Sequence, residues 1–297
     1  MQQACLLCRQ VGDIRESHVL PAFVFRWLKG TSATGYMRFN QAPNKRIQDG
    51  IKRRWLCESC EQKFSQWEKR FAEEIFHPLD KNPEQQASYN SWLLKFCVSV
   101  SWRVLHLLEE KATHPNDDQR AAAENAKHVW RSFLLDEIAN PREFEQHLLV
   151  MGVADRMIAD DLPTNMNRYL LRSIAFNIHR GENAGAVFSK IGRFILLGFF
   201  KKPSMRSWEG TKVRLQRGKV DAKLTRMPRW FFSVLAREAQ KSADLANLLS
   251  ARQQEIIDQA ILNDTDRAVK SASLVALSHD YEMFGPSAFL NKRDSRD

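Results

Sequence analysis

Two cysteine pairs hold the residues whose types and spacing most clearly predict chemistry. They are Cys5-Leu-Leu-Cys8 and Cys57-Glu-Ser-Cys60, and they account for four of the five cysteines in the chain. Two thiolates separated by two residues reach one ion from a tight turn, and two such pairs complete the tetrahedron that Zn²⁺ accepts without strain. We therefore predict a structural zinc ion bound by these four cysteines. Disulfide bonding is the alternative, but the first residues do not resemble a secretory signal, which favours a reducing, cytoplasmic setting.

The elements that position these cysteines are expected to be short. The first pair should form a turn, residues 14–20 a short strand that stops at a proline, and residues 51–56 a basic strand. The second pair should open a helix, because apolar side chains recur after it at helical spacing, and His77-Pro78 should end that helix. A cysteine turn, strands and a helix carrying the second pair form the layout of a treble clef zinc fold.

A histidine lies between the two pairs, within Ser17-His18-Val19-Leu20-Pro21. The pairs are 48 residues apart, a longer span than zinc fingers use, so this segment should carry structure of its own. His18 has two interpretations. It is either a core histidine or a zinc ligand in place of one cysteine, or it contacts phosphate or takes part in catalysis.

The motifs CLLC, ESHVLP and LCESCEQKFSQWE, in that order, resemble the zinc-containing HNH endonucleases. The resemblance covers the first 80 residues, about a quarter of the chain. It implies a ββα-metal fold in which zinc braces the site, a strand-borne histidine is the general base, and a separate Mg²⁺ or Mn²⁺ ion stabilises the leaving oxygen. By position, it implies that His18 is the base and that Ser17 and Glu61 occupy metal-ligand positions, with Gln62 where Asn is common.

The chain departs from that family at the metal-ligand positions. Family members usually have an acidic residue before the histidine and His or Asn after the last cysteine, where this chain has Ser17 and Glu61. A carboxylate suits Mg²⁺ or Mn²⁺, whereas a serine hydroxyl is a weak ligand. Glu16 or Glu58 could supply a second carboxylate. An active metal site and a degenerate one are both compatible with these residues.

The formal net charge of +10 is concentrated in two islands. Residues 1–70 carry 13 basic and six acidic side chains, and residues 181–230 carry 12 and three, whereas the segments after each island are acidic overall. Such islands are typical of proteins that bind phosphates, although basic side chains also serve solubility. We predict that they contact a nucleic-acid backbone through Arg38, Lys45, Arg46, Arg53, Arg54, Lys212 and Arg214.

The rest of the chain predicts an α+β fold that is predominantly α. Residues 81–180 should be a helical region, with helices near 91–110, 117–139, 142–151 and 164–179, and Cys97 should be plain core. Residues 181–297 should be a basic β segment followed by C-terminal helices. Within it, residues 212–220 should form a hairpin whose basic face either follows nucleic acid or is simply solvated. Helix signals then occur at Pro228, at Ser250 with Gln253, and at Gly285-Pro286.

Two functions are compatible with these features. The first is a metal-dependent endonuclease of HNH type, acting on DNA in preference to RNA. The second is a catalytically degenerate zinc-braced module that binds nucleic acid or protein, for instance in a bacterial defence or mobile-element assembly. The apolar runs are too short or too interrupted to span a membrane, so no membrane partner is expected, and no GxGxxG or P-loop motif indicates nucleotide hydrolysis.

Overall fold

A computed structural model describes residues 3–39, 42–110, 117–155, 162–182, 184–203 and 208–289. About 49% of the chain is helical and the strands form small antiparallel sheets, which confirms the predicted α+β class with mainly helical content. The chain divides into two compact units, each built from three segments. Unit 1 comprises Met1–Ala22, Gly50–Val150 and Ile174–Met227, and unit 2 comprises Phe23–Asp49, Met151–Ser173 and Pro228–Asp297. The boundaries predicted near residues 80 and 180 stay a prediction.

Unit 1 begins with the cysteine module, which we define as β1, β2, β3, β6 and α2. Strands β1 (Gln3–Ala4) and β2 (Val11–Gly12) pair on either side of the first cysteine turn. Strand β3 (Ile14–His18) pairs antiparallel with β6 (Lys52–Cys57), and α2 (Glu58–Arg70) follows β6 directly. A cysteine turn, a strand pair and a helix thus follow one another in the order that the sequence predicts.

The helix that carries the second cysteine pair continues beyond its predicted end. Helix α2 passes into a π-helical turn, Phe71–Phe76, and then into α3 (His77–Lys81). In the π turn the His77 amide bonds to the carbonyl of Ala72, five residues back. Pro78 lies directly after the π turn, in the first turn of α3. The prediction that His77-Pro78 ends the helix is therefore wrong.

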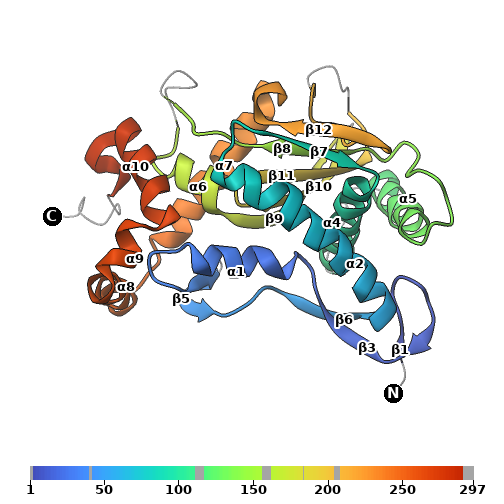
Figure 1. Ribbon diagram of the computed structural model, residues 1–297, viewed down its shortest axis with the longest axis horizontal. Coiled ribbons are helices and arrows are strands. Elements are labelled where there is room, and N and C mark those ends of the chain that lie inside the picture. The colour runs from blue at the N-terminus through green and yellow to red at the C-terminus, as the bar shows by residue number, and fades with distance from the viewer. Residues whose placement is uncertain are drawn as a thin grey trace. The chain divides into compact units, whose positions relative to one another are not determined.

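An antiparallel sheet and two long helices form the core of unit 1. The sheet has the order β8 (Gln146–Val150), β11 (Phe194–Lys201), β10 (Ala184–Ile191), β9 (Ile174–Gly181). Helix α4 (Trp92–Glu109) packs against the sheet and against α2, as Figure 1 shows, and α5 (Asp117–Leu134) packs beside it. Cys97 on α4 is fully buried, in agreement with its predicted role as core.

Three predicted elements differ from the structure. The helix expected near 142–151 is β8, whose residues are all buried, so the apolar run has no alternation to mark it as a strand. The helix expected over 164–179 ends at Arg172, and the chain then forms strand β9. The hairpin expected over 212–220 is absent from the described chain, because β12 (Arg217–Asp221) pairs with β7 (Gln86–Asn90) instead. A Cβ at Gly218 would lie 2.3 Å from the Tyr89 hydroxyl, so glycine permits this pairing.

Unit 2 contains a hairpin and most of the C-terminal helices. It holds α1 (Ala22–Gly30) from its second residue on, and the hairpin of β4 (Met37–Phe39) and β5 (Ala42–Ile47). Its other helices are α6 (Met166–Arg172), α7 (Arg229–Ala246), α8 (Ala251–Asn263), α9 (Thr265–Val269) and α10 (Ala272–Phe284). Short 3₁₀ turns lie at Ala222–Leu224 in unit 1 and at Gly285–Ala288 in unit 2.

The predicted helix signals of unit 2 are confirmed. Pro228 directly precedes α7, and the Ser250 hydroxyl accepts a hydrogen bond from the Gln253 amide at the start of α8. Gly285 ends α10 with a positive φ of 58°, a conformation that glycine adopts without strain. Within the described residues, no helix is long and apolar enough to cross a bilayer.

Candidate metal centre and adjoining site

The four predicted cysteines come together in unit 1. Their sulfur atoms all lie within 4.8 Å of one another, and the Sγ atoms of Cys8 and Cys57 are 3.7 Å apart. A tetrahedral zinc ion with Zn–S bonds of about 2.3 Å requires sulfurs about 3.8 Å apart. Cys5 and Cys60 are buried, and the other two are partly exposed. The set is therefore close to the geometry that a zinc ion needs, as the spacing predicts.

Backbone hydrogen bonds build this cluster from both sides. The Cys5 amide donates to the Gln10 carbonyl at 2.8 Å and the Arg9 amide to the Cys5 carbonyl at 2.9 Å, which closes the first turn. Arg9 has a φ of 67°, the left-handed conformation that such a turn needs. The Cys57 amide points at the Cys5 sulfur, with a nitrogen–sulfur distance of 3.4 Å. The first turn and the start of α2 thus face one another across the sulfurs.

The thiols of the cluster differ in acidity. Burial raises the pKa of Cys60, and its closeness to the other cysteines raises it further. Burial acts in the same direction on Cys57, but hydrogen bonds from the Ser59 hydroxyl and the backbone of Cys60 outweigh it and lower the pKa of Cys57 to about 6. Because metal binding requires thiolates, zinc affinity is expected to fall as the pH decreases.

Strand β3 and helix α2 bring Ser17 and Glu61 into direct contact. The Ser17 hydroxyl is fully buried and donates to Glu61 Oε2 at 2.6 Å. The β3–β6 register places His18 opposite Lys52 and Ser17 opposite Arg53. His18, the next residue after Ser17, is partly exposed at the end of β3. Two predicted site residues, Ser17 and Glu61, thus bond to each other, and the candidate base is the next residue along β3.

Two further charged residues, Glu68 and Arg103, belong to this group. Arg103 on α4 is 1% exposed; its Nη1 donates to the backbone carbonyl of His18 at 2.7 Å, and its Nη2 lies 2.7 Å from Glu68 Oε1. Burial raises the pKa of Glu68, although Arg103 acts to lower it. The charge of Glu61 also raises this pKa, and that of His18 lowers it. We call Ser17, His18, Glu61, Glu68 and Arg103 the His18 cluster.

Two signals in the sequence mark these additional residues. Glu68 lies seven residues after Glu61, which places both carboxylates on one face of a helix. Arg103 lies among the buried residues of a mostly apolar helix, and a buried charge needs a partner.

The His18 cluster is not a preassembled metal site. Across the ranges that the structure describes, the four cysteines are the only group of three or more His, Cys, Asp or Glu side chains close enough to share an ion. Glu16 and Gln62 are exposed. Glu58 is also exposed and pairs with Arg15 at 3.0 Å. A divalent ion at Glu61 would therefore need water or phosphate oxygens to complete its coordination.

The predicted nucleic-acid-binding residues divide between the two units. Arg53, Arg54, Lys212 and Arg214 lie in unit 1 with the His18 cluster, and Arg38, Lys45 and Arg46 lie in unit 2. Arg54 and Arg214 are exposed, while Arg53 pairs with Glu110 at 3.7 Å.

The basic residues of unit 2 lie on its hairpin. The Arg38 side chain donates to the Pro43 carbonyl and to Gln253. The Arg46 guanidinium stacks 4.0 Å above the Tyr36 ring, and Lys45 is exposed. Arg38 thus has a structural role, whereas Lys45 and Arg46 present charge to solvent.

Lys212 also forms an ion pair, which predicts a pH-dependent stability. Glu145 is 12% exposed, and Lys202 and Lys212 donate to its Oε1 at 2.5 and 2.8 Å. Burial acts to raise the pKa of Glu145, but these lysines outweigh it and lower the pKa from 4.5 to about 2. Its stabilising contribution is therefore complete above about pH 4.5 and is lost as the pH falls towards 2.

We expect Glu145→Gln to lower the free energy of unfolding by up to about 3 kcal/mol at pH 7, with the difference shrinking below pH 4.5. Urea denaturation between pH 3 and 7 measures this effect. The exposed Glu143→Gln is the matched control and should change little. A deficit in Glu145→Gln that stays constant over this range would contradict the ion-pair explanation.

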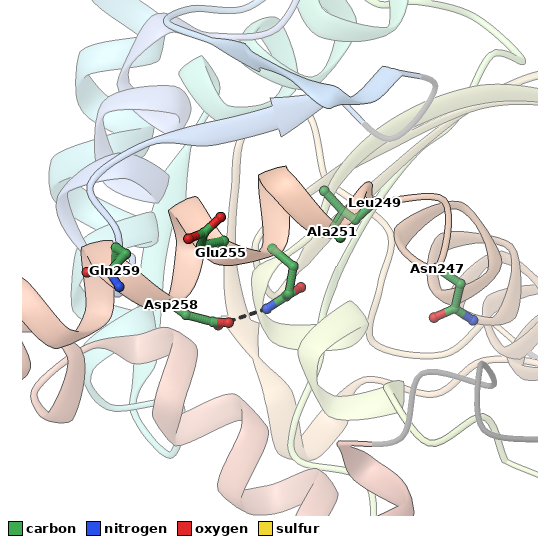
Figure 2. Close-up of a pocket in the computed structure, with 7 residues that line it drawn as sticks. Asn247, Leu249, Ala251, Glu255, Asp258 and Gln259 are labelled. Atoms are coloured by element: carbon green, nitrogen blue, oxygen red, sulfur yellow. Dashed lines mark hydrogen bonds between the residues drawn. The ribbon is translucent and has the colours of Figure 1, made fainter.

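A hollow of about 440 Å³ lies in unit 2 beside the start of α8. Figure 2 shows its lining, in which Gln254 donates to Asp258 at 2.9 Å. Glu255 and Asp258 are exposed, so water solvates their carboxylates. The other residues that line it are Asn247, Leu249, Ala251 and Gln259. The lining residues include no histidine, cysteine, lysine or arginine, so the hollow does not compete with the His18 cluster as a candidate site.

Comparison with known proteins adds no assignment: no protein-family model matches the chain, and no curated protein or solved structure matches it.

Proposed function

We propose that this protein is a metal-dependent endonuclease of HNH type that hydrolyses phosphodiester bonds in nucleic acid, with DNA the preferred substrate. His18 is the general base that activates water, and Glu61 is a ligand of a Mg²⁺ or Mn²⁺ ion. That ion, when bound, stabilises the charge on the leaving oxygen. The zinc ion is a brace, because four thiolates leave it no open position for a substrate.

One observation carries the proposal: the Ser17–Glu61 hydrogen bond, 2.6 Å long, joins α2 to the β3 residue that directly precedes His18. It joins the strand and the helix that the HNH resemblance requires to share a site. In the proposed site Ser17 orients the Glu61 carboxylate instead of binding the ion itself. Such an outer partner fixes the geometry of a metal ligand.

Charge on the neighbouring strand supports a phosphate substrate. Lys52, Arg53 and Arg54 succeed one another on β6, and the register pairs them with His18, Ser17 and Glu16 of β3. Arg54 is exposed, and Lys52 and Arg53 are partly exposed. A phosphodiester bound beside His18 would therefore meet positive charge from the paired strand, which both attracts the substrate and stabilises charge in the transition state.

A second candidate function is a zinc-braced module that binds nucleic acid without cutting it. It is favoured by the lack of a second metal-ligand set among the described residues and by the serine at position 17. Such a protein could act within a larger bacterial assembly. It would bind in a salt-sensitive way, because each neutralised phosphate releases counterions, and would not cleave with any divalent ion.

Incubation of the zinc-loaded full-length protein with supercoiled plasmid distinguishes the two functions. We expect nicking in Mg²⁺ or Mn²⁺ and none after those ions are removed under conditions that retain zinc. Zinc content measured in every sample separates loss of the catalytic ion from loss of the brace. Binding that weakens with salt, without nicking in either ion, would reject the nuclease and support the binding module.

A further inference from the structure

We propose that Arg103, which lies on α4 outside the cysteine module, is a positioning residue for His18. This inference rests on the proposed function, because it concerns how the candidate base is held. It makes helix α4 part of the site, so the cysteine module alone would form an incomplete site.

Hydrogen bonds fix both sides of the peptide group that follows His18. Its carbonyl accepts from Arg103 Nη1 at 2.7 Å, and its amide, that of Val19, donates to the Ile51 carbonyl at 3.0 Å. A peptide group is planar, so two bonds in opposite directions determine its orientation. The orientation of this plane sets the direction in which the His18 side chain leaves the backbone.

The guanidinium of Arg103 is itself held in one position. Its Nε donates to the Ser99 carbonyl at 3.2 Å, one turn earlier on α4, and its Nη2 pairs with Glu68 at 2.7 Å. Its Cζ lies 5.1 Å from the centre of the Phe64 ring. The planar Arg103 guanidinium is held on three sides and is 1% exposed, so it fixes the position of His18 relative to α4 with little freedom.

This arrangement has a kinetic consequence. A general base must lie within hydrogen-bond reach of the water that it activates, and a displacement of about 1 Å can cost on the order of 100-fold in rate. Glu68 comes from α2, which also carries Glu61. Arg103 therefore holds the strand of the candidate base and the helix of the candidate metal ligand in one register.

Substitution of both partners separates positioning from stability. Removal of one member of a buried ion pair leaves a buried charge and destabilises the fold, whereas replacement of both by apolar residues restores stability. We expect R103M and the double variant R103M/E68M to lower kcat at least tenfold with KM within twofold of the wild type. E68M alone, which leaves the Arg103–His18 bond available, should lose less.

The matched control is the double variant R180M/E109M. It removes another ion pair of low exposure, between β9 and α4, whose two members do not belong to the His18 cluster. This control should keep kcat within twofold of the wild type. Wild-type kcat in R103M/E68M, or an equal loss in E68M alone, would overturn the positioning role.

Hydrogen exchange provides a readout that does not depend on cleavage. The amide of Val19 should exchange at least tenfold faster in R103M/E68M than in the wild type, and at the wild-type rate in R180M/E109M. Unchanged exchange of Val19 in R103M/E68M would overturn the inference. Faster exchange in a protein that never cleaves DNA would support the positioning of the peptide while rejecting the proposed nuclease.

Discussion

His18→Ala is expected to lower the rate of plasmid cleavage at least about 100-fold, which is the lower end of what a positioned general base contributes. The side chain is partly exposed at the end of β3, so its loss should leave little cavity. The backbone carbonyl that Arg103 binds is retained in the variant. We therefore expect normal folding, one zinc ion per chain and normal affinity for DNA in the absence of cleavage.

The control for this experiment is His128→Ala. His128 is an exposed histidine on α5, in the same unit and outside the His18 cluster. The His128→Ala variant should cleave plasmid at the wild-type rate. Full activity in His18→Ala, with cleavage shown to be intrinsic to the protein, would eliminate His18 as the base and with it the proposed mechanism.

Cys60→Ser is expected to unfold the cysteine module. Zinc binding to a structural four-thiolate site contributes on the order of 10 kcal/mol to folding, and a hydroxyl cannot replace the lost thiolate. Cys60 lies in the first turn of α2, two residues before Gln62 and one before Glu61. Loss of the metal should therefore free the start of the helix that carries the candidate ligand, and cleavage should be lost with it.

Metal analysis and thermal unfolding of Cys60→Ser measure this prediction. Dialysis against a mild chelator should leave the wild type with one zinc ion and the variant with less than one. The first turn of α2 should lose its protection from hydrogen exchange. Cys97→Ala, which removes a buried thiol from the core of α4, should keep its zinc. A Cys60→Ser protein that retains one zinc ion and an unchanged melting temperature would refute the structural role of the site.

The four-cysteine cluster could be predicted because its information is local. Four cysteines in two closely spaced pairs allow few arrangements other than a shared ion, and the turn and the helix that carry them follow from short stretches of sequence. The same holds for the capping residues Ser250 and Gln253 and for the glycine that ends α10.

Elements that depend on distant pairing could not be predicted in this way. Strand β8 is buried at all five positions, so its apolar run matches a buried helix as well as a strand. Strand β12 pairs with β7, which lies more than a hundred residues earlier in the chain. Gly218 allows the close approach to Tyr89, but a glycine in the sequence does not indicate which distant strand it will meet.

The His18 cluster combines both kinds of information. The positions of His18 and Glu61 relative to the cysteine pairs are local features, and they could be proposed as a site from the sequence. The Arg103–Glu68 pair joins α4 to α2, and no spacing rule connects residues 35 apart in two helices. The burial of Ser17 and its bond to Glu61 likewise depend on how β3 packs on α2.

A crystal of the zinc-loaded protein soaked in Mn²⁺ tests the central claim most directly, because anomalous scattering distinguishes the two metals. We expect zinc within the four cysteine sulfurs and a separate manganese ion bound by the Glu61 carboxylate on the side of His18. Zinc at the cysteines with no manganese beside Glu61 and His18 would contradict the nuclease proposal and leave the zinc-braced binding module.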